Sequence, residues 1–203
     1  MRQNRKVLLL RAALALYQGD FSQTETWIKR AQKQGEDEAS QLALARLEIA
    51  QGLNETAIHR LKKILRAAPE NFDAKLTLAQ AYLKTGQDGR LEALLKPLKA
   101  IKRGFGRVHL LLSRSLINRG LLPAAASTLS DGLRTWPRQP ELAQLYTATL
   151  GFLGRYNQAI PILEEMQHFT HRYSQLFRYR LWEYYQKAGK TKQFRQYPLP
   201  LEF

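Results

Sequence analysis

Four glycines recur at a fixed interval along this chain of 203 residues, and they restrict what it can fold into. Each follows the one before by 34 residues: Gly52, Gly86, Gly120 and Gly154. Small or apolar residues keep the same step five positions later, at Ala57, Leu91, Ala125 and Ala159. A period of this length marks an array of repeated units, each burying its apolar side against its neighbours. The sequence therefore predicts a repeat protein.

Within each period the residue types indicate two antiparallel helices. Apolar residues recur three and four apart, at Leu42, Ile49, Ile58, Leu61, Ile64 and Leu65, which is helical spacing. Glycine can take the left-handed conformation that ends the first helix. Pro69 and Pro137, each 17 residues after a turn glycine, cannot continue the second helix. No segment sustains the alternation of a strand, so the expected class is all-α.

This pattern resembles the tetratricopeptide repeat family, over about residues 5–197. The resemblance implies a right-handed α-solenoid in one domain, 1–203, with units at 5–37, 38–71, 72–105, 106–139 and 140–173. The first unit is one residue short and turns at Gly19. The third departs from the family pattern, with Leu91 where alanine is usual and Pro97 inside its second helix, which we expect to be kinked or to start late.

The C-terminal end carries half of the aromatic residues, between positions 169 and 203. We expect a cap over 174–197, with one helix over 174–187 and a short second helix ended by Pro198, then an extended tail over 198–203. Bulky aromatic side chains with polar edges suit such a cap. The same end is a candidate homodimer interface.

Catalytic and metal motifs are incomplete in this sequence. Gly189-Lys190-Thr191 resembles the end of a phosphate-binding loop, but Tyr184 stands where that loop needs glycine. His168 and His171 are spaced to share a metal ion, yet no third ligand accompanies them, and the chain has no cysteine. We therefore expect no enzyme activity, no catalytic residues, no metal and no cofactor. The acids Glu36, Asp37 and Glu38 are expected to cap a helix.

Positive charge dominates, with 32 Lys and Arg against 17 Asp and Glu, for a net charge of +15. Between Glu92 and Asp131 there is no acidic residue. This window holds a basic patch of Lys96, Lys99, Lys102 and Arg103. Such an imbalance favours acidic partners.

The resemblance also implies which side chains line a concave groove. In this family the residue after the small residue of the first helix faces the groove, together with residues one turn away. The polar residues selected are Arg46, Gln80, Lys84, Arg107, Arg114, Asn118, Arg178 and Trp182. Arginines spaced among apolar residues suit an acidic or amphipathic segment of a partner protein. Leu9 and Ala13 stand where chaperone-binding members carry lysine and asparagine, which argues against a chaperone adaptor.

The hypothesis is thus a non-enzymatic scaffold or adaptor, of the kind that assembles bacterial envelope, secretion or pilus complexes. The alternative is electrostatic binding of nucleic acid or of an anionic membrane surface. Residues 7–18 are interpreted as an amphipathic helix, because Arg11 interrupts the apolar run too early for a signal peptide. No segment is long enough to span a membrane. The expected location is the cytoplasm, or a soluble domain of a longer envelope protein.

Overall fold

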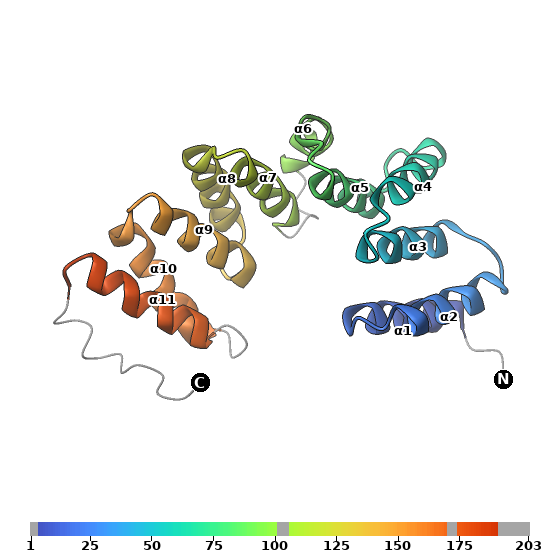
Figure 1. The fold of residues 1–203 in the computed structure, drawn as a ribbon, viewed down its shortest axis with the longest axis horizontal. Helices are drawn as coiled ribbons and strands as arrows, with labels where there is room; N and C mark the ends of the chain where they lie inside the picture. The colour runs from blue at the N-terminus through green and yellow to red at the C-terminus, as the bar shows by residue number, and fades with distance from the viewer. Residues whose placement is uncertain (1–3, 101–105, 170–173, 191–203) are drawn as a thin grey trace. The chain divides into compact units, whose positions relative to one another are not determined.

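A computed structural model describes residues 4–100, 106–169 and 174–190, and all regular elements in these ranges are helical (Figure 1). The first helices of the successive pairs are α1 (Arg5–Tyr17), α3 (Glu38–Ala50), α5 (Phe72–Lys84), α7 (Arg107–Asn118) and α9 (Pro140–Phe152). The second helices are α2 (Phe21–Gln32), α4 (Asn54–Ala67), α6 (Asp88–Leu95), α8 (Leu122–Thr135) and α10 (Tyr156–Phe169). A further helix, α11 (Ser174–Lys187), follows them. The predicted all-α array of antiparallel helix pairs is confirmed.

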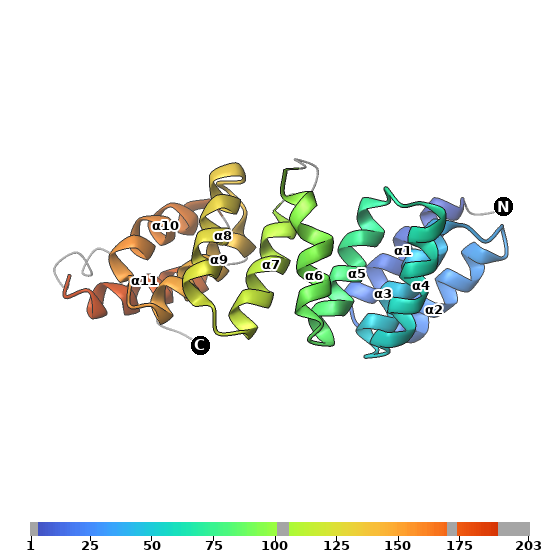
Figure 2. The same cartoon turned by 90° about the horizontal axis from the view of Figure 1, so that it is seen from above.

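The chain forms two compact units, residues 1–97 and 98–203. In the first unit, α1, α3 and α5 contact one another in sequence, and α2 and α4 each pack on the first helix of the following pair. In the second unit, α9 is packed against α7, α8 and α10 in the same way. Figure 2 shows the helices of each unit side by side. Each unit buries its apolar residues between consecutive helices, as a linear repeat array requires.

The turns follow the predicted chemistry. Gly52, Gly86, Gly120 and Gly154 all have positive φ, between 67° and 82°, in the left-handed region that ends a helix. The capping prediction is also confirmed at α3, where the Asp37 carboxylate accepts from the backbone N–H of Ser40 at 2.9 Å. The Ser40 side chain accepts from the Asp37 N–H in return, completing a capping box.

The first helix departs from its prediction. It runs from Arg5 to Tyr17, and Leu8, Ala12 and Ala15 are buried on one side. On the other side, however, Leu10 and Leu14 are exposed. Because apolar residues lie on both sides, the prediction of an amphipathic helix over 7–18 is wrong in its amphipathic part. A helix that is apolar on several sides is suited to being covered on several sides.

Pro97 disturbs the third pair, at a different place from the one expected. The second helix of that pair, α6, starts in register at Asp88 but ends at Leu95. A 3₁₀ helix, η1 (Lys96–Ala100), contains the proline. The helix therefore neither kinks nor starts late. Proline lacks the N–H that the next turn needs, and its ring collides with the carbonyl four residues before it.

Three of the C-terminal aromatic residues that the structure describes are part of the core. Phe177, Tyr184 and Tyr185 of α11 are buried among residues of α9 and α10. The Tyr184 hydroxyl donates to the Thr147 carbonyl at 2.9 Å. The helix expected over 174–187 is present as α11, while the expected second helix and the tail lie outside the described residues.

Candidate protein-binding groove

An apolar hollow of the first unit lies along its first helices. It has a volume of about 690 Å³. Its walls are side chains of α1 and α3, with α2 residues Thr24 and Ile28 also contributing. The apolar lining consists mainly of Leu9, Leu10, Ala13, Leu16, Tyr17, Leu42 and Ala43. We call this hollow the α1–α3 groove. Apolar clefts with a few polar groups are typical binding sites.

Three charged side chains lie at the border of the α1–α3 groove. Lys6 and Arg46 line it from α1 and α3, and Asp73 lines it from the first turn of α5. Arg46 and Asp73 form an ion pair with an N–O distance of 3.9 Å, and their side chains are 40% and 57% exposed. An exposed pair this long contributes little stability. The ion pair between Arg46 and Asp73 therefore adds little to the contact between α3 and α5.

The structure places the other predicted groove residues outside this hollow. Gln80 is half-buried on α5, and Lys84 is exposed at the end of that helix. In the second unit, Arg107, Arg114 and Asn118 are found along α7, and none of the three is buried. Their spacing of seven and four residues places them on one face of that helix.

Arg178 and Trp182 lie one turn apart on α11, where Arg178 is exposed and Trp182 is half-buried. The Trp182 ring stacks on Tyr179 with ring centroids 5.9 Å apart. Arg114, Ala148 and Trp182 occupy equivalent repeat positions on the first helices α7, α9 and α11. The second unit therefore carries polar surface residues of its own at the positions that the repeat predicts.

The basic patch is only partly within the described residues. Lys96 is paired with Glu92 at 3.4 Å, and Lys99 is exposed. Lys102 and Arg103 lie outside the described ranges. His171 does as well, and the His168 side chain is not described. Among the described residues, no group of three His, Asp or Glu side chains could hold a metal ion.

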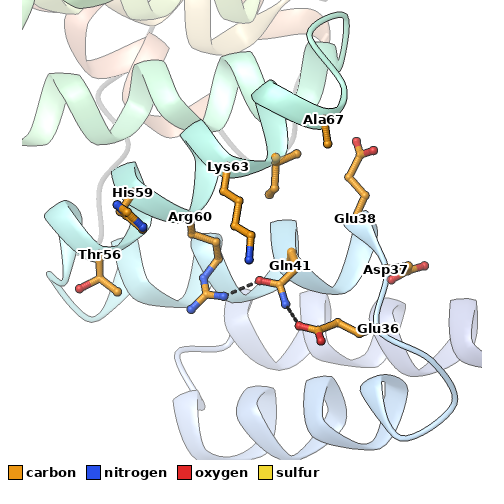
Figure 3. Close-up of a pocket in the computed structure, with 10 residues that line it drawn as sticks. Glu36, Asp37, Glu38, Gln41, Thr56, His59, Arg60, Lys63 and Ala67 are labelled. Atoms are coloured by element: carbon orange, nitrogen blue, oxygen red, sulfur yellow. Dashed lines mark hydrogen bonds between the residues drawn. The ribbon is translucent and has the colours of Figure 1, made fainter.

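A second hollow in the first unit, of about 550 Å³, is lined mainly by charged and polar residues (Figure 3). Glu36, Asp37 and Glu38 line it before and at the start of α3, and His59, Arg60 and Lys63 line it from α4. Arg60 binds the Glu48 carboxylate at 2.7 and 3.1 Å and also donates to Gln41. The Glu48 hydrogen bond is the main cause of a raised pKa for Arg60, which burial partly opposes. This charged network joins α3 to α4, so its first role is structural.

His109 is a packing residue on α7. Its side chain is buried against Gly132 of α8. Burial lowers the pKa of His109, and the charge of Lys99 lowers it further. The folded state therefore favours the neutral form of the His109 imidazole. His109 binds a proton more readily in the unfolded chain than in the folded one. The free energy of unfolding therefore decreases as pH falls below the ordinary histidine pKa of about 6.5.

Comparison with known proteins agrees with this geometry. A sequence profile described as tetratricopeptide repeat matches residues 48–109, which include α4, α5 and α6. Residues 48–109 thus match tetratricopeptide repeats in sequence, and the described helix pairs have the tetratricopeptide fold. No curated protein sequence matches it significantly.

Several solved structures share this fold. A thermophilic tetratricopeptide protein of Thermus thermophilus superposes with a TM-score of 0.67 at 17% identity, covering 91% of this chain and 99% of that one. PilF of Pseudomonas aeruginosa gives a TM-score of 0.71 at 15% identity, covering 94% and 88%. PilW, described as a widely conserved type IV pilus biogenesis factor, gives 0.74 at 15% identity, covering 95% and 90%.

The tetratricopeptide fold is that of a protein–protein interaction scaffold, and such scaffolds recognise other proteins. Fold alone does not select the partner. None of the described helices is long and apolar enough to cross a membrane.

Two features of the site were missing from the sequence prediction. One is Asp73, which lies 27 residues from Arg46 in the sequence and still forms an ion pair with it. The other is the set of apolar residues on the exposed side of α1. The apolar residues on the exposed side could have been found from the sequence. Leu8, Ala12 and Ala15 follow helical spacing on one side of the helix, and a second set follows it on another side: Val7, Leu10, Leu14 and Tyr17.

Proposed function

We propose that this protein is a non-enzymatic scaffold whose α1–α3 groove binds an acidic or amphipathic segment of a partner protein. The observation that carries the proposal is the groove itself, an apolar hollow of about 690 Å³ bordered by Lys6 and Arg46. Apolar residues of the partner would lie on Leu9, Leu16 and Leu42. A carboxylate of the partner would replace Asp73 beside the Arg46 fork, which binds carboxylates with two parallel hydrogen bonds.

The second unit supplies a further surface of the same character. Arg107 and Arg114 on α7 and Arg178 on α11 are exposed cations, and Trp182 offers an aromatic ring one turn from Arg178. A second acidic segment would bind there. The net charge of +15 supports acidic partners in general.

The cellular role we propose is assembly of a bacterial envelope, secretion or pilus complex. The support is the likeness to PilW, described as a type IV pilus biogenesis factor, and to PilF. At 15% identity this likeness concerns the fold, so the role depends on finding the partner.

The test is to identify the partner by site-specific cross-linking and then to measure binding. A photoreactive amino acid at the exposed position Ala13 would capture whatever occupies the groove. Purified partner would then be titrated against Ala13→Trp, which fills the hollow, and Arg46→Glu, which reverses its charge. We expect each variant to weaken binding by at least about tenfold, equivalent to about 1.4 kcal/mol.

Ala93→Trp provides the matched control, because Ala93 is exposed on α6, outside the groove. It should bind the partner as the wild type does. If Ala13→Trp and Arg46→Glu also bind normally, the groove is not the binding site and the proposal fails.

The alternative function is electrostatic binding of nucleic acid or of an anionic membrane surface. The acid-free window from Glu92 to Asp131 is the observation that favours it. Charge alone supports affinities of roughly 10⁻⁴ to 10⁻⁶ M for nucleic acid. This alternative predicts a steep dependence of binding on salt concentration, because the phosphate contacts release counterions.

A further inference from the structure

The exposed side of α1 is the surface that later first helices use for stacking. The first repeat is one residue short, so positions in α1 correspond to positions 33 residues later in α3. Val7 corresponds to Ser40 of α3, Ala74 of α5 and Leu142 of α9, which are all 0% exposed.

Leu14 behaves in the same way. Its counterparts Leu47, Ala81 and Thr149 are between 0% and 4% exposed. Leu47 packs with Ala12 of α1 and Ile28 of α2, so this face is the one that contacts the preceding helix pair. We call Val7, Leu10 and Leu14 the stacking face of α1.

On α1 the stacking face is uncovered. Val7 is 42% exposed, Leu10 is 69% exposed and Leu14 is 58% exposed. Val7 and Leu14 do not line the α1–α3 groove, so the stacking face extends beyond it. Burying three such side chains would bring a large apolar area out of water, which is the main favourable contribution to protein association.

The charges around the stacking face indicate what could cover it. Helix α1 carries Arg5, Lys6 and Arg11 and no acidic residue. Arg11 of α1 and Arg30 of α2 both lie over the Trp27 ring, at 4.9 and 4.8 Å from its centroid. Two copies of this face brought together would place cationic helices against each other. A helix bearing carboxylates beside its apolar stripe is the complementary partner.

We propose that the stacking face of α1 binds an amphipathic helix of a partner protein, whose apolar stripe covers Val7, Leu10 and Leu14 and whose Asp or Glu side chains face Lys6, Arg11 and Arg30. The partner helix would occupy the place that α2 occupies on α3. Because Val7 and Leu14 lie outside the α1–α3 groove, this site can be tested separately from the groove.

The probe is a synthetic peptide based on the chain's own stacking helix. The peptide has the sequence of α4, which packs on α5, with Arg60, Lys62, Lys63 and Arg66 replaced by Glu. It keeps the apolar stripe of Ile58, Leu61, Ile64 and Leu65. The unaltered basic α4 peptide is the charge control. Binding is measured by fluorescence anisotropy of the labelled peptides, and helix formation by circular dichroism.

We expect the acidic peptide to bind and to become helical, and the basic peptide to bind at least about tenfold more weakly. Leu14→Asp should weaken binding of the acidic peptide by at least about tenfold. Phe152→Asp is the matched control, because Phe152 is 80% exposed on α9 and its replacement adds the same charge. Ala13→Trp should leave peptide binding unchanged, which separates this site from the groove.

Three results would overturn the proposal. The first is equal affinity of wild type and Leu14→Asp for the acidic peptide. The second is self-association of the wild type that Leu14→Asp abolishes in sedimentation equilibrium, because the occupant would then be a second copy. The third is binding to phosphatidylserine-containing vesicles that Leu14→Asp abolishes without any peptide binding, because the face would then meet a membrane.

Discussion

Gly151 and Gly89 both lie inside helices, but the space around them differs. A methyl group on Gly151 of α9 would overlap the hydroxyl and ring of Tyr184. That hydroxyl is fixed by its hydrogen bond to the Thr147 carbonyl, so the ring cannot move without losing the bond. A methyl group on Gly89 of α6 would meet no atom within 4 Å. The close approach of α11 to α9 therefore requires glycine at position 151. The packing around α6 does not require glycine at position 89.

At the residue scale we predict that replacing glycine by alanine has opposite effects on the free energy of unfolding at these two positions. Gly151→Ala should lower the free energy of unfolding by about 1–3 kcal/mol, the usual cost of overpacking a core. Gly89→Ala should raise it by about 0.5–1 kcal/mol, because alanine restricts the unfolded chain and favours a helix. Urea unfolding followed by circular dichroism measures both. Two shifts of the same sign would contradict this account of α9 and α11.

At the element scale, the two prolines inside second helices have different consequences. Pro161 is the sixth residue of α10, and that helix continues to Phe169. Pro97 follows the eight residues of α6, and the chain changes there to a 3₁₀ helix. Pro161 lies beyond the first four N–H groups, which have no intrahelical partner, so α10 continues although one of its hydrogen bonds is lost. At Pro97 the same loss coincides with the end of the α-helical turns of α6.

We therefore predict that Pro97→Ala lengthens α6. Proline costs about 3 kcal/mol relative to alanine within a helix, so its removal should allow α-helical hydrogen bonds to continue through Lys96 and Leu98. The measurement is the ¹³Cα chemical shift of residues 96–99, which should move toward α-helical values. Pro161→Ala is the control and should change shifts only next to the substitution, since α10 is already continuous. Unchanged shifts at residues 96–99 would mean that packing of Leu98, and not the proline, ends α6.

The elements that sequence predicts well are those whose cause is local. The turn glycines, the Asp37 cap and the helix over 174–187 depend on residues within a few positions, so their signals can be read directly. The end of α6 was misplaced because proline disturbs the residues before it and the prediction placed the effect at the start. Features formed between distant residues were missed. The pairing of Arg46 with Asp73 and the exposure of Leu14 both depend on which helices stand beside which.

The polar groove residues show the same limit more clearly. Their repeat position was predicted from the family resemblance, and Arg46 does line the α1–α3 groove. Gln80 occupies the corresponding position on α5 and Lys84 lies one turn after it, but neither lines the groove. Repeat position fixes the direction of a side chain on its helix. The depth of a hollow also depends on side-chain size, and small residues such as Ala13 and Ala43 open it beside α1 and α3.

At the scale of the whole molecule, the net charge of +15 is the property that both proposed functions must share. Charges on a protein surface are screened over about 10 Å at 0.1 M salt, while the burial of apolar side chains is not screened. The salt dependence of binding therefore distinguishes the two proposed functions. Nucleic-acid binding through phosphates falls steeply with salt because counterions are released.

We predict that a double-stranded oligonucleotide binds this protein weakly at about 50 mM salt and loses at least about tenfold in affinity by about 200 mM. Binding of a partner segment in the α1–α3 groove should change much less over the same range, because it depends on Leu9, Leu16 and Leu42. Lys99→Gln combined with Arg114→Gln should reduce the salt slope for the oligonucleotide. Ala13→Trp should leave that slope unchanged, since it alters an apolar wall and no charge. Fluorescence anisotropy with labelled ligands follows both reactions. Sequence-dependent oligonucleotide binding that stays submicromolar at about 200 mM salt would make nucleic acid the ligand, because charge alone does not distinguish sequences.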